Sequence, residues 1–234
     1  MGVGEKISEF MWKDVTPQFL MTKNEKCVYH YRLVTTCVIG FLNVIQLVYP
    51  LFFAHMTNWG LTFCTITFLL LTLSYKYESV RNWAHLSFEI SWCFEFMIFF
   101  VFWVVLFWPY YEMLGYEVIL YSLYAHFGLM VLLAIDYFLA YYDFHRKHLV
   151  LAYTFAIAYG ILNICLTLYE FEVYPIMTYH NTWSFLTIAF IFALVWISFE
   201  VPILINKCRS KPQQEKQDST PLIGADAPEE VIIQ

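Results

Sequence analysis

Hydrophobic residues fall into six long segments that are separated by short polar connections. The segments cover residues 33–53, 57–75, 84–108, 117–141, 149–169 and 184–206. An α-helix rises about 1.5 Å per residue, so about 20 apolar residues are enough to cross the hydrocarbon core of a bilayer. The pattern therefore predicts an all-α membrane protein, a bundle of six transmembrane helices over residues 33–206.

The two ends of the chain are more polar than the predicted bundle. Residues 1–32 mix acidic, basic and a few large apolar residues, which is typical of a cytosolic arm that can lie at the membrane interface. Residues 207–234 are rich in Lys, Gln, Pro, Asp and Glu, a composition that predicts a disordered tail. We therefore expect one membrane domain between an N-terminal arm and a C-terminal tail.

Basic residues indicate how the bundle is oriented. All 13 Lys and Arg residues lie before the first segment, between the second and third, between the fourth and fifth, or after the sixth. The other connections carry Glu112, Glu170 and Glu172 and no basic residue. Because connections rich in Lys and Arg stay in the cytosol, this alternation places both termini there and requires an even number of spans.

The composition excludes most other classes of protein. Hydrophobic residues make up 60% of the chain, a share that few soluble domains approach. The net charge is −6, and we expect no nucleic-acid partner. The six cysteines lie in predicted spans or on the predicted cytosolic side, so no structural disulfide is expected. No Cys-x-x-Cys spacing is present, and we expect neither a metal nor a cofactor.

Ionisable residues inside a membrane are costly and often mark function. The predicted spans place Glu89, Asp136 and Glu200 at similar depth in the cytosolic half, with Glu95 nearer the middle. Without a Lys or Arg partner, these carboxyl groups cannot all stay ionised at low cost. They could form a path for protons or cations, or they could cap and solvate helix ends at the interface.

The opposite half of the bundle holds a threonine and a histidine on different predicted spans. Thr57 begins the second segment and His126 lies in the fourth, and both segments enter from the non-cytosolic side. A histidine beside a hydroxyl can take its proton, so that the oxygen attacks a carbonyl carbon. The alternative is structural, because threonines in helices usually bond to their own backbone. By contrast, His145 and His148 flank basic residues in a cytosolic connection and are expected at the surface.

Three short stretches resemble one family. Residues 55–60 read His-Met-Thr-Asn-Trp-Gly, residues 126–128 read His-Phe-Gly with Asp136 ten positions after the histidine, and residues 173–176 read Val-Tyr-Pro-Ile. Together they are similar to motifs of the androgen-induced transmembrane proteins and their invertebrate relative, rolling stone. The order and spacing of the three stretches carry the resemblance, which covers most of residues 33–206.

The resemblance implies an activity. The mammalian members are threonine hydrolases of lipid esters, acting on fatty acid esters of hydroxy fatty acids. Their essential threonine and histidine correspond to Thr57 and His126, so a lipid ester is the implied substrate and membrane lipids the implied surroundings. Two alternatives stay open: a proton- or cation-coupled transporter or channel that uses the carboxylates, and a non-catalytic membrane organiser like rolling stone.

The predicted tail contains a possible sorting signal. After Asp218 come three residues and then Leu222 and Ile223, the spacing of the acidic dileucine motif that clathrin adaptors bind. This motif predicts an endosomal or lysosomal membrane, with the plasma membrane as the alternative.

Overall fold

The computed structural model describes residues 3–13, 15, 17, 19, 24–48, 52–116, 119, 123–171, 173, 174, 177 and 179–209. All regular secondary structure in these residues is helical, as the apolar segments predict. The predicted tail, with Asp218, Leu222 and Ile223, lies outside the described residues.

Five stretches of the described residues are long and apolar enough to cross a membrane. Four of them are built on α2 (Glu25–Gln46), α3 (Met56–Leu73), α8 (Leu149–Leu168) and α9 (Thr182–Cys208). The fifth begins with a short 3-10 turn, η2 (Glu78–Val80), and continues through α4 (Arg81–Val101). It then passes through a π-helical segment, η3 (Phe102–Leu106), into α5 (Phe107–Leu114). These lengths and compositions are those of an integral membrane protein.

The fourth predicted span differs from the others. Its described part consists of a π-helical segment, η4 (Leu123–Gly128), and α7 (Leu129–Leu139). The continuous apolar helix Leu123–Leu139 is shorter than the other five, and several residues before it lie outside the described part of the chain. The structure therefore identifies five candidate spans and one shorter apolar helix.

The first span begins earlier than the apolar pattern predicts. The side chain of Asn24 caps α2 by accepting the Cys27 N–H at 3.3 Å, and Glu25 stands in the first turn. Both features stabilise the N-terminus of a helix. Arg32, which the apolar pattern assigns to the polar arm, therefore lies inside α2 and is fully buried.

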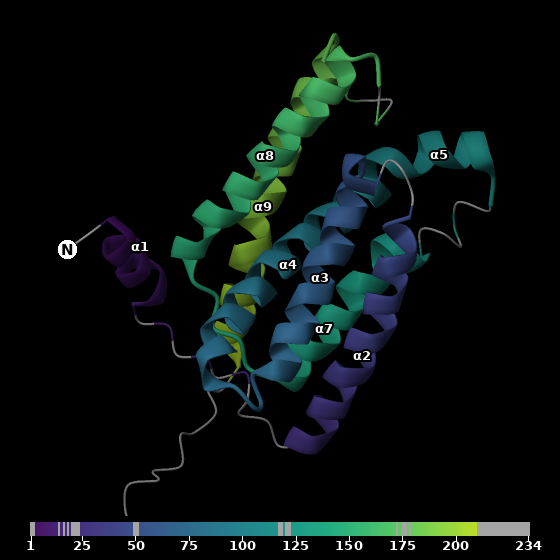
Figure 1. The fold of residues 1–234 in the computed structure, drawn as a ribbon. Coiled ribbons are helices and arrows are strands. Elements are labelled where there is room, and N and C mark those ends of the chain that lie inside the picture. Colours follow the sequence, from purple (N-terminus) through teal and green to yellow (C-terminus); the bar gives the residue numbers. More distant parts are fainter. Residues whose placement is uncertain are drawn as a thin grey trace, which may run out of the picture.

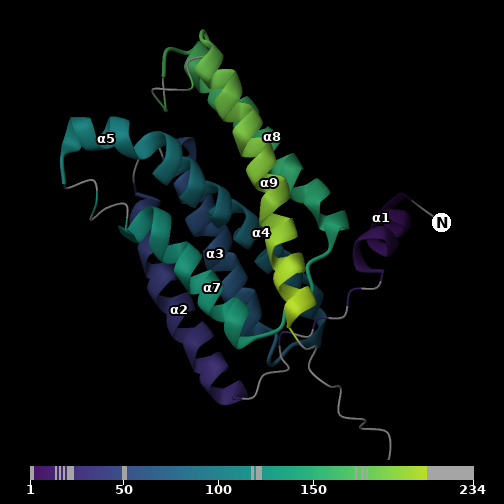
Figure 2. The same ribbon diagram turned by 180° about the vertical axis from the view of Figure 1, so that it is seen from behind.

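α4 forms the centre of the molecule. It contacts α3, α7, α8 and α9, and most of its side chains between Ala84 and Ile98 are buried. Figures 1 and 2 show α2, α3, α4 and α7 side by side, with α8 and α9 running together along another side of α4. α5 turns away from the axis of α4 in both views. The bundle thus has a packed centre around α4 and a more open end where α5 leaves it.

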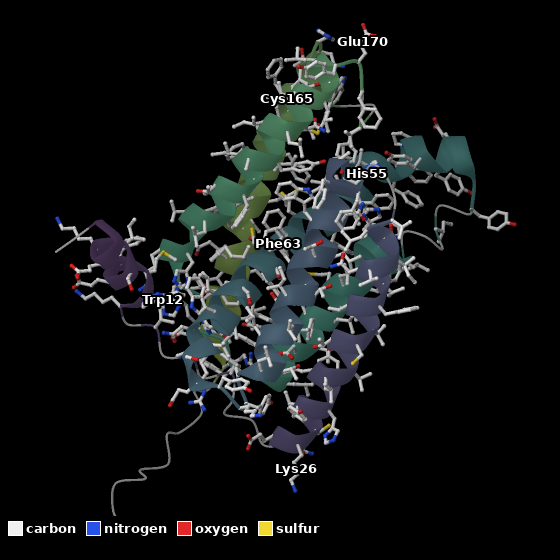
Figure 3. The ribbon with its side chains drawn as sticks, viewed as in Figure 1. Trp12, Lys26, His55, Phe63, Cys165 and Glu170 are labelled. Carbon is white, nitrogen blue, oxygen red and sulfur yellow. The ribbon has the colours of Figure 1, made fainter. Side chains whose placement is uncertain are left out.

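The outer faces of the peripheral helices are apolar. Large hydrophobic side chains such as Phe41 on α2, Ile161 on α8 and Trp196 on α9 are exposed. A soluble protein rarely exposes so many, whereas lipid-facing helices do. Figure 3 places Lys26 at one end of the molecule and Glu170 at the other, which matches the separation of basic and acidic connections.

Candidate functional site

A cavity of about 250 Å³ lies where α3 begins and α4 ends. α8, α9 and η4 complete its walls, together with the connection between α8 and α9. Most of its lining is Met, Ile, Val, Leu and Phe. The polar side chains along it are Thr57, His126, Tyr159, Tyr174, Tyr179 and Thr187. Thr57 and His126, the two residues singled out in the sequence, thus line the same cavity.

Thr57 differs from other threonines of the bundle in its hydrogen bonding. Six of these donate their hydroxyl to the carbonyl four residues earlier at 2.7 to 3.0 Å: Thr36, Thr62, Thr65, Thr72, Thr154 and Thr167. Thr57 is the second residue of α3, and His55 is the N-cap. The residue four positions before Thr57 is therefore outside α3, and the helix offers no carbonyl there. Within the described part of the chain, the Thr57 hydroxyl makes no hydrogen bond, which leaves it available to a ligand in the cavity.

The start of α3 also contributes electrostatically. The first N–H groups of a helix have no partner within the helix, and the helix dipole makes this end positive. Such an end stabilises negative charge on a nearby oxygen. Thr57 therefore occupies a position where an alkoxide or a tetrahedral oxyanion is favoured relative to bulk hydrocarbon.

His126 is held against the end of α4. Its ring stacks on Phe102 with 3.9 Å between ring centroids and an interplanar angle of 9°, and the residue is buried. Both residues belong to π-helical segments, which occur frequently at functional sites. His126 lies within electrostatic range of His55, at the N-cap of α3. Burial lowers the pKa of His55, so that this neighbour is neutral at pH 7.

A tyrosine cluster fixes the entry of the chain into α3. The Tyr174 hydroxyl accepts the Met56 N–H at 3.1 Å and lies 3.4 Å from the Tyr159 hydroxyl. Tyr159 in turn donates to the carbonyl of Ala54 at 2.7 Å. The sequence pattern did not identify this cluster, because it combines α8 with the connection after it. The only signal was Tyr174 in the third family-like stretch.

One wall of the cavity reaches the outer apolar surface. Ile157, Ile161 and Ile164 on α8 line the cavity and are 47%, 57% and 41% exposed, and Phe192 on α9 is 38% exposed. These side chains belong to the face that would contact lipid. A ligand with a hydrocarbon chain could therefore enter from the membrane.

Asp136 does not line this cavity but forms a buried ion pair. Arg32 donates from Nε to Oδ2 and from Nη2 to Oδ1, each at 2.8 Å, and both side chains have no exposed surface. The Tyr142 hydroxyl donates a third hydrogen bond to the same carboxylate. The prediction that this carboxylate lacks a basic partner was wrong, because α2 begins at Glu25 and carries Arg32 to the depth of Asp136.

The other carboxylates also have partners of their own. Glu200 accepts two hydrogen bonds of 2.7 Å from Arg146. Glu89 is surrounded by His85, His145 and His148. His145 and His148 were expected at the surface, yet the side chain of His148 is fully buried and that of His145 is only 18% exposed. The side chain of His85 is fully buried as well.

Glu95 lies in the centre of the bundle. It is fully buried, and the Cys64 thiol donates to its Oε1 at 3.7 Å. The four carboxylates are therefore divided among separate sites, and none of these contacts connects them into one path.

Comparisons of the chain with protein-family models, with curated proteins and with solved structures gave no match. The resemblance of the three stretches therefore stays a prediction. Residues 175 and 176 of the third stretch lie outside the described residues.

Proposed function

We propose that this protein hydrolyses lipid esters, with Thr57 as the nucleophile and His126 as the general base. The observation that carries the proposal is their common position on one apolar cavity, where the Thr57 hydroxyl makes no hydrogen bond to the backbone of the described residues. The resemblance to the androgen-induced transmembrane proteins supports the same two residues and suggests fatty acid esters of hydroxy fatty acids as substrates.

The proposed reaction has two half-reactions. An imidazole nitrogen of His126 takes the Thr57 proton while the oxygen attacks the ester carbonyl, and the tetrahedral oxyanion forms beside the positive end of α3. The intermediate collapses to an acyl-threonine, and His126 returns the proton to the departing alcohol. Water then attacks the acyl carbon while His126 accepts one of its protons. The acyl C–O bond to Thr57 breaks, His126 returns the proton to the Thr57 oxygen, and the carboxylic acid leaves.

The two side chains do not hydrogen bond directly to each other in the described structure. Catalytic contacts are commonly long without substrate and shorten in the complex. The cavity of about 250 Å³ is slightly smaller than typical small-molecule sites of about 300–1,000 Å³, so it would hold the ester group and only the adjoining part of a bound ester. Its hydrocarbon chain would extend past Ile161 toward the lipid.

The membrane arrangement that fits this proposal has six spans. Leu123–Leu139, together with residues before it, would form the additional crossing, and both termini would then lie in the cytosol. The cavity would lie under the non-cytosolic leaflet, and the end with Lys26 would face the cytosol.

The proposed compartment depends on the tail. We propose that a clathrin adaptor binds Asp218, Leu222 and Ile223 and directs the protein to endosomes or lysosomes. Replacing Leu222 and Ile223 together with Ala should move the protein to the cell surface, as measured by surface biotinylation. An unchanged distribution would contradict the sorting role without affecting the proposed hydrolysis.

The activity is tested with purified full-length protein in detergent micelles and a fatty acid ester of a hydroxy fatty acid. Thr57→Ala should reduce turnover to background, and Thr57→Ser should retain part of it because the hydroxyl is kept. His126→Ala should lower kcat by about 10²–10⁴, the usual contribution of a general base. Thr62→Ala, in which a backbone-bonded threonine of the same helix is replaced, is the matched control and should resemble the wild type.

Two results would reject the proposal. The first is a Thr57→Ala or His126→Ala variant with the turnover of Thr62→Ala. The second is a folded wild-type protein that hydrolyses no ester, which would favour a non-catalytic membrane organiser.

A further inference from the structure

Two histidines and one carboxylate converge at the opposite end of α4 from the cavity. His85 and Glu89 stand on successive turns of α4, and His145 lies in the connection before α8. Each offers one ligand atom, and these atoms lie within 4.8 Å of one another. Among the described residues, this is the group of His, Cys, Asp and Glu side chains that meets this spacing.

The ring nitrogens of the two histidines lie too far from the Glu89 carboxylate for hydrogen bonds. His85 Nε2 lies 3.5 Å and His145 Nδ1 lies 3.6 Å from the same oxygen, Glu89 Oε1. A direct bond between such atoms would be about 2.7–3.2 Å long. Ligands of a tetrahedral metal ion, at about 2.1 Å from the metal, stand about 3.4 Å apart. The observed separations match the edges of such a tetrahedron.

A further oxygen completes the set of donors. The carbonyl oxygen of Asp143 lies 3.0 Å from His85 Nε2. The proposed ligand atom of His145, Nδ1, is buried and has no hydrogen-bond partner among the described residues. Buried polar atoms without partners are uncommon in folded proteins and often face an ion or water.

We propose that His85, Glu89 and His145 bind a divalent cation of the zinc class. Two imidazole nitrogens and one carboxylate oxygen are ligands that Zn²⁺ uses in proteins, and the Asp143 carbonyl or a water would occupy the fourth position. Binding at His85 Nε2 displaces the proton that this atom shares with the Asp143 carbonyl, and in the neutral ring that proton moves to Nδ1, so that the bound imidazole stays neutral.

A second layer of contacts orients the carboxylate. The backbone N–H of His145 donates to Glu89 Oε1 at 2.7 Å, and His148 Nδ1 hydrogen bonds to Glu89 Oε2. The other nitrogen of His148 lies 3.0 Å from the carbonyl of Met11 in α1 (Val3–Trp12). Such outer contacts fix the ligands of metal sites. The ion would therefore join α4, the connection before α8, and the N-terminal helix.

The position of the site gives the ion a structural role. Glu89 and Met97, the nearest cavity residue on α4, are eight residues apart, or about 12 Å along the helix. The metal is therefore separate from Thr57 and His126, and the two proposals can fail independently.

The site is tested by calorimetric titration of Zn²⁺ into purified, chelator-treated full-length protein in detergent. We expect one ion per chain. His145→Ala should weaken binding at least about 100-fold, since loss of an outer-layer partner alone typically costs about 10–100-fold. His30→Ala is the matched control, because His30 is exposed on α2 and, among the described residues, hydrogen bonds only to the Lys26 carbonyl. The Zn²⁺ affinity of this variant should equal that of the wild type.

Co²⁺ provides a second measurement on the unaltered chain, which does not depend on whether a variant folds. A tetrahedral nitrogen and oxygen site should give intense visible absorption that Zn²⁺ abolishes. Absence of stoichiometric Zn²⁺ binding by the wild type would overturn the proposal. Equal affinities of the His145→Ala and His30→Ala variants would do the same, because the ion would then bind elsewhere.

Discussion

Replacing Arg32 with Met should destabilise the protein strongly. Arg32 supplies both charge-assisted bonds of 2.8 Å to Asp136, and neither side chain is exposed. Met is apolar and similar in length, so the substitution leaves the carboxylate buried, with the Tyr142 hydroxyl as its remaining side-chain donor in the described part of the chain. Breaking a buried ion pair by removing one partner costs about 3–5 kcal/mol, and we expect a loss of this size in the free energy of unfolding.

The assay is equilibrium unfolding in mixed micelles of a mild detergent and dodecyl sulfate, followed by far-UV circular dichroism. Arg146→Met is the matched control, since Arg146 also makes two bonds to a carboxylate but is 66% exposed. Exposed pairs contribute little, so this variant should resemble the wild type.

A double variant separates the loss of an ion pair from the loss of packing. Arg32→Met combined with Asp136→Leu removes both charges and should recover much of the stability that Arg32→Met loses. The reasoning would be refuted if Arg32→Met were no more destabilising than Arg146→Met. It would also be refuted if the double variant were less stable than Arg32→Met.

Two further predictions concern the packing of α3 and the size of the cavity. A methyl group at Gly60 would collide with the buried Glu95 side chain, so Gly60→Ala should destabilise the protein by about 1–3 kcal/mol in the same unfolding assay. Gly40→Ala, whose new methyl would meet only ordinary contacts, should not. Ala156→Phe narrows the cavity and should raise KM for long-chain esters more than for short-chain esters, whereas equal changes for both would contradict the proposed position of the acyl chain.

The helical architecture could be predicted because it depends on local composition. Long apolar segments have few alternatives to membrane-spanning helices, and five of the six predicted segments correspond to helices of sufficient length. The segment around His126 was less predictable, since it combines a π-helical turn with a short α-helix. Such local changes in helix type depend on packing, here against Phe102, rather than on composition.

The site was only partly predictable. Thr57 and His126 could be assigned to the same end of the bundle, because the second and fourth predicted spans enter the membrane from the same side. The partner of Asp136 could not be assigned, because the helix that carries Arg32 begins at the Asn24 cap, and the apolar pattern does not include this first part of the helix. The histidine cluster combines Glu89 and His145, which are 56 positions apart in the sequence. The only feature in the local sequence that pointed to this cluster was the spacing of His85 and Glu89, which places both on one face of a helix.

The proposed catalytic role of Thr57 is tested most directly by locating the adduct of a fluorophosphonate probe, which reacts with activated serine and threonine nucleophiles. The purified protein is labelled, digested and mapped by peptide mass spectrometry. We predict an adduct on Thr57 in the wild type that is strongly reduced in His126→Ala and unchanged in Thr62→Ala. An adduct on another residue, or none on Thr57, would contradict the proposal.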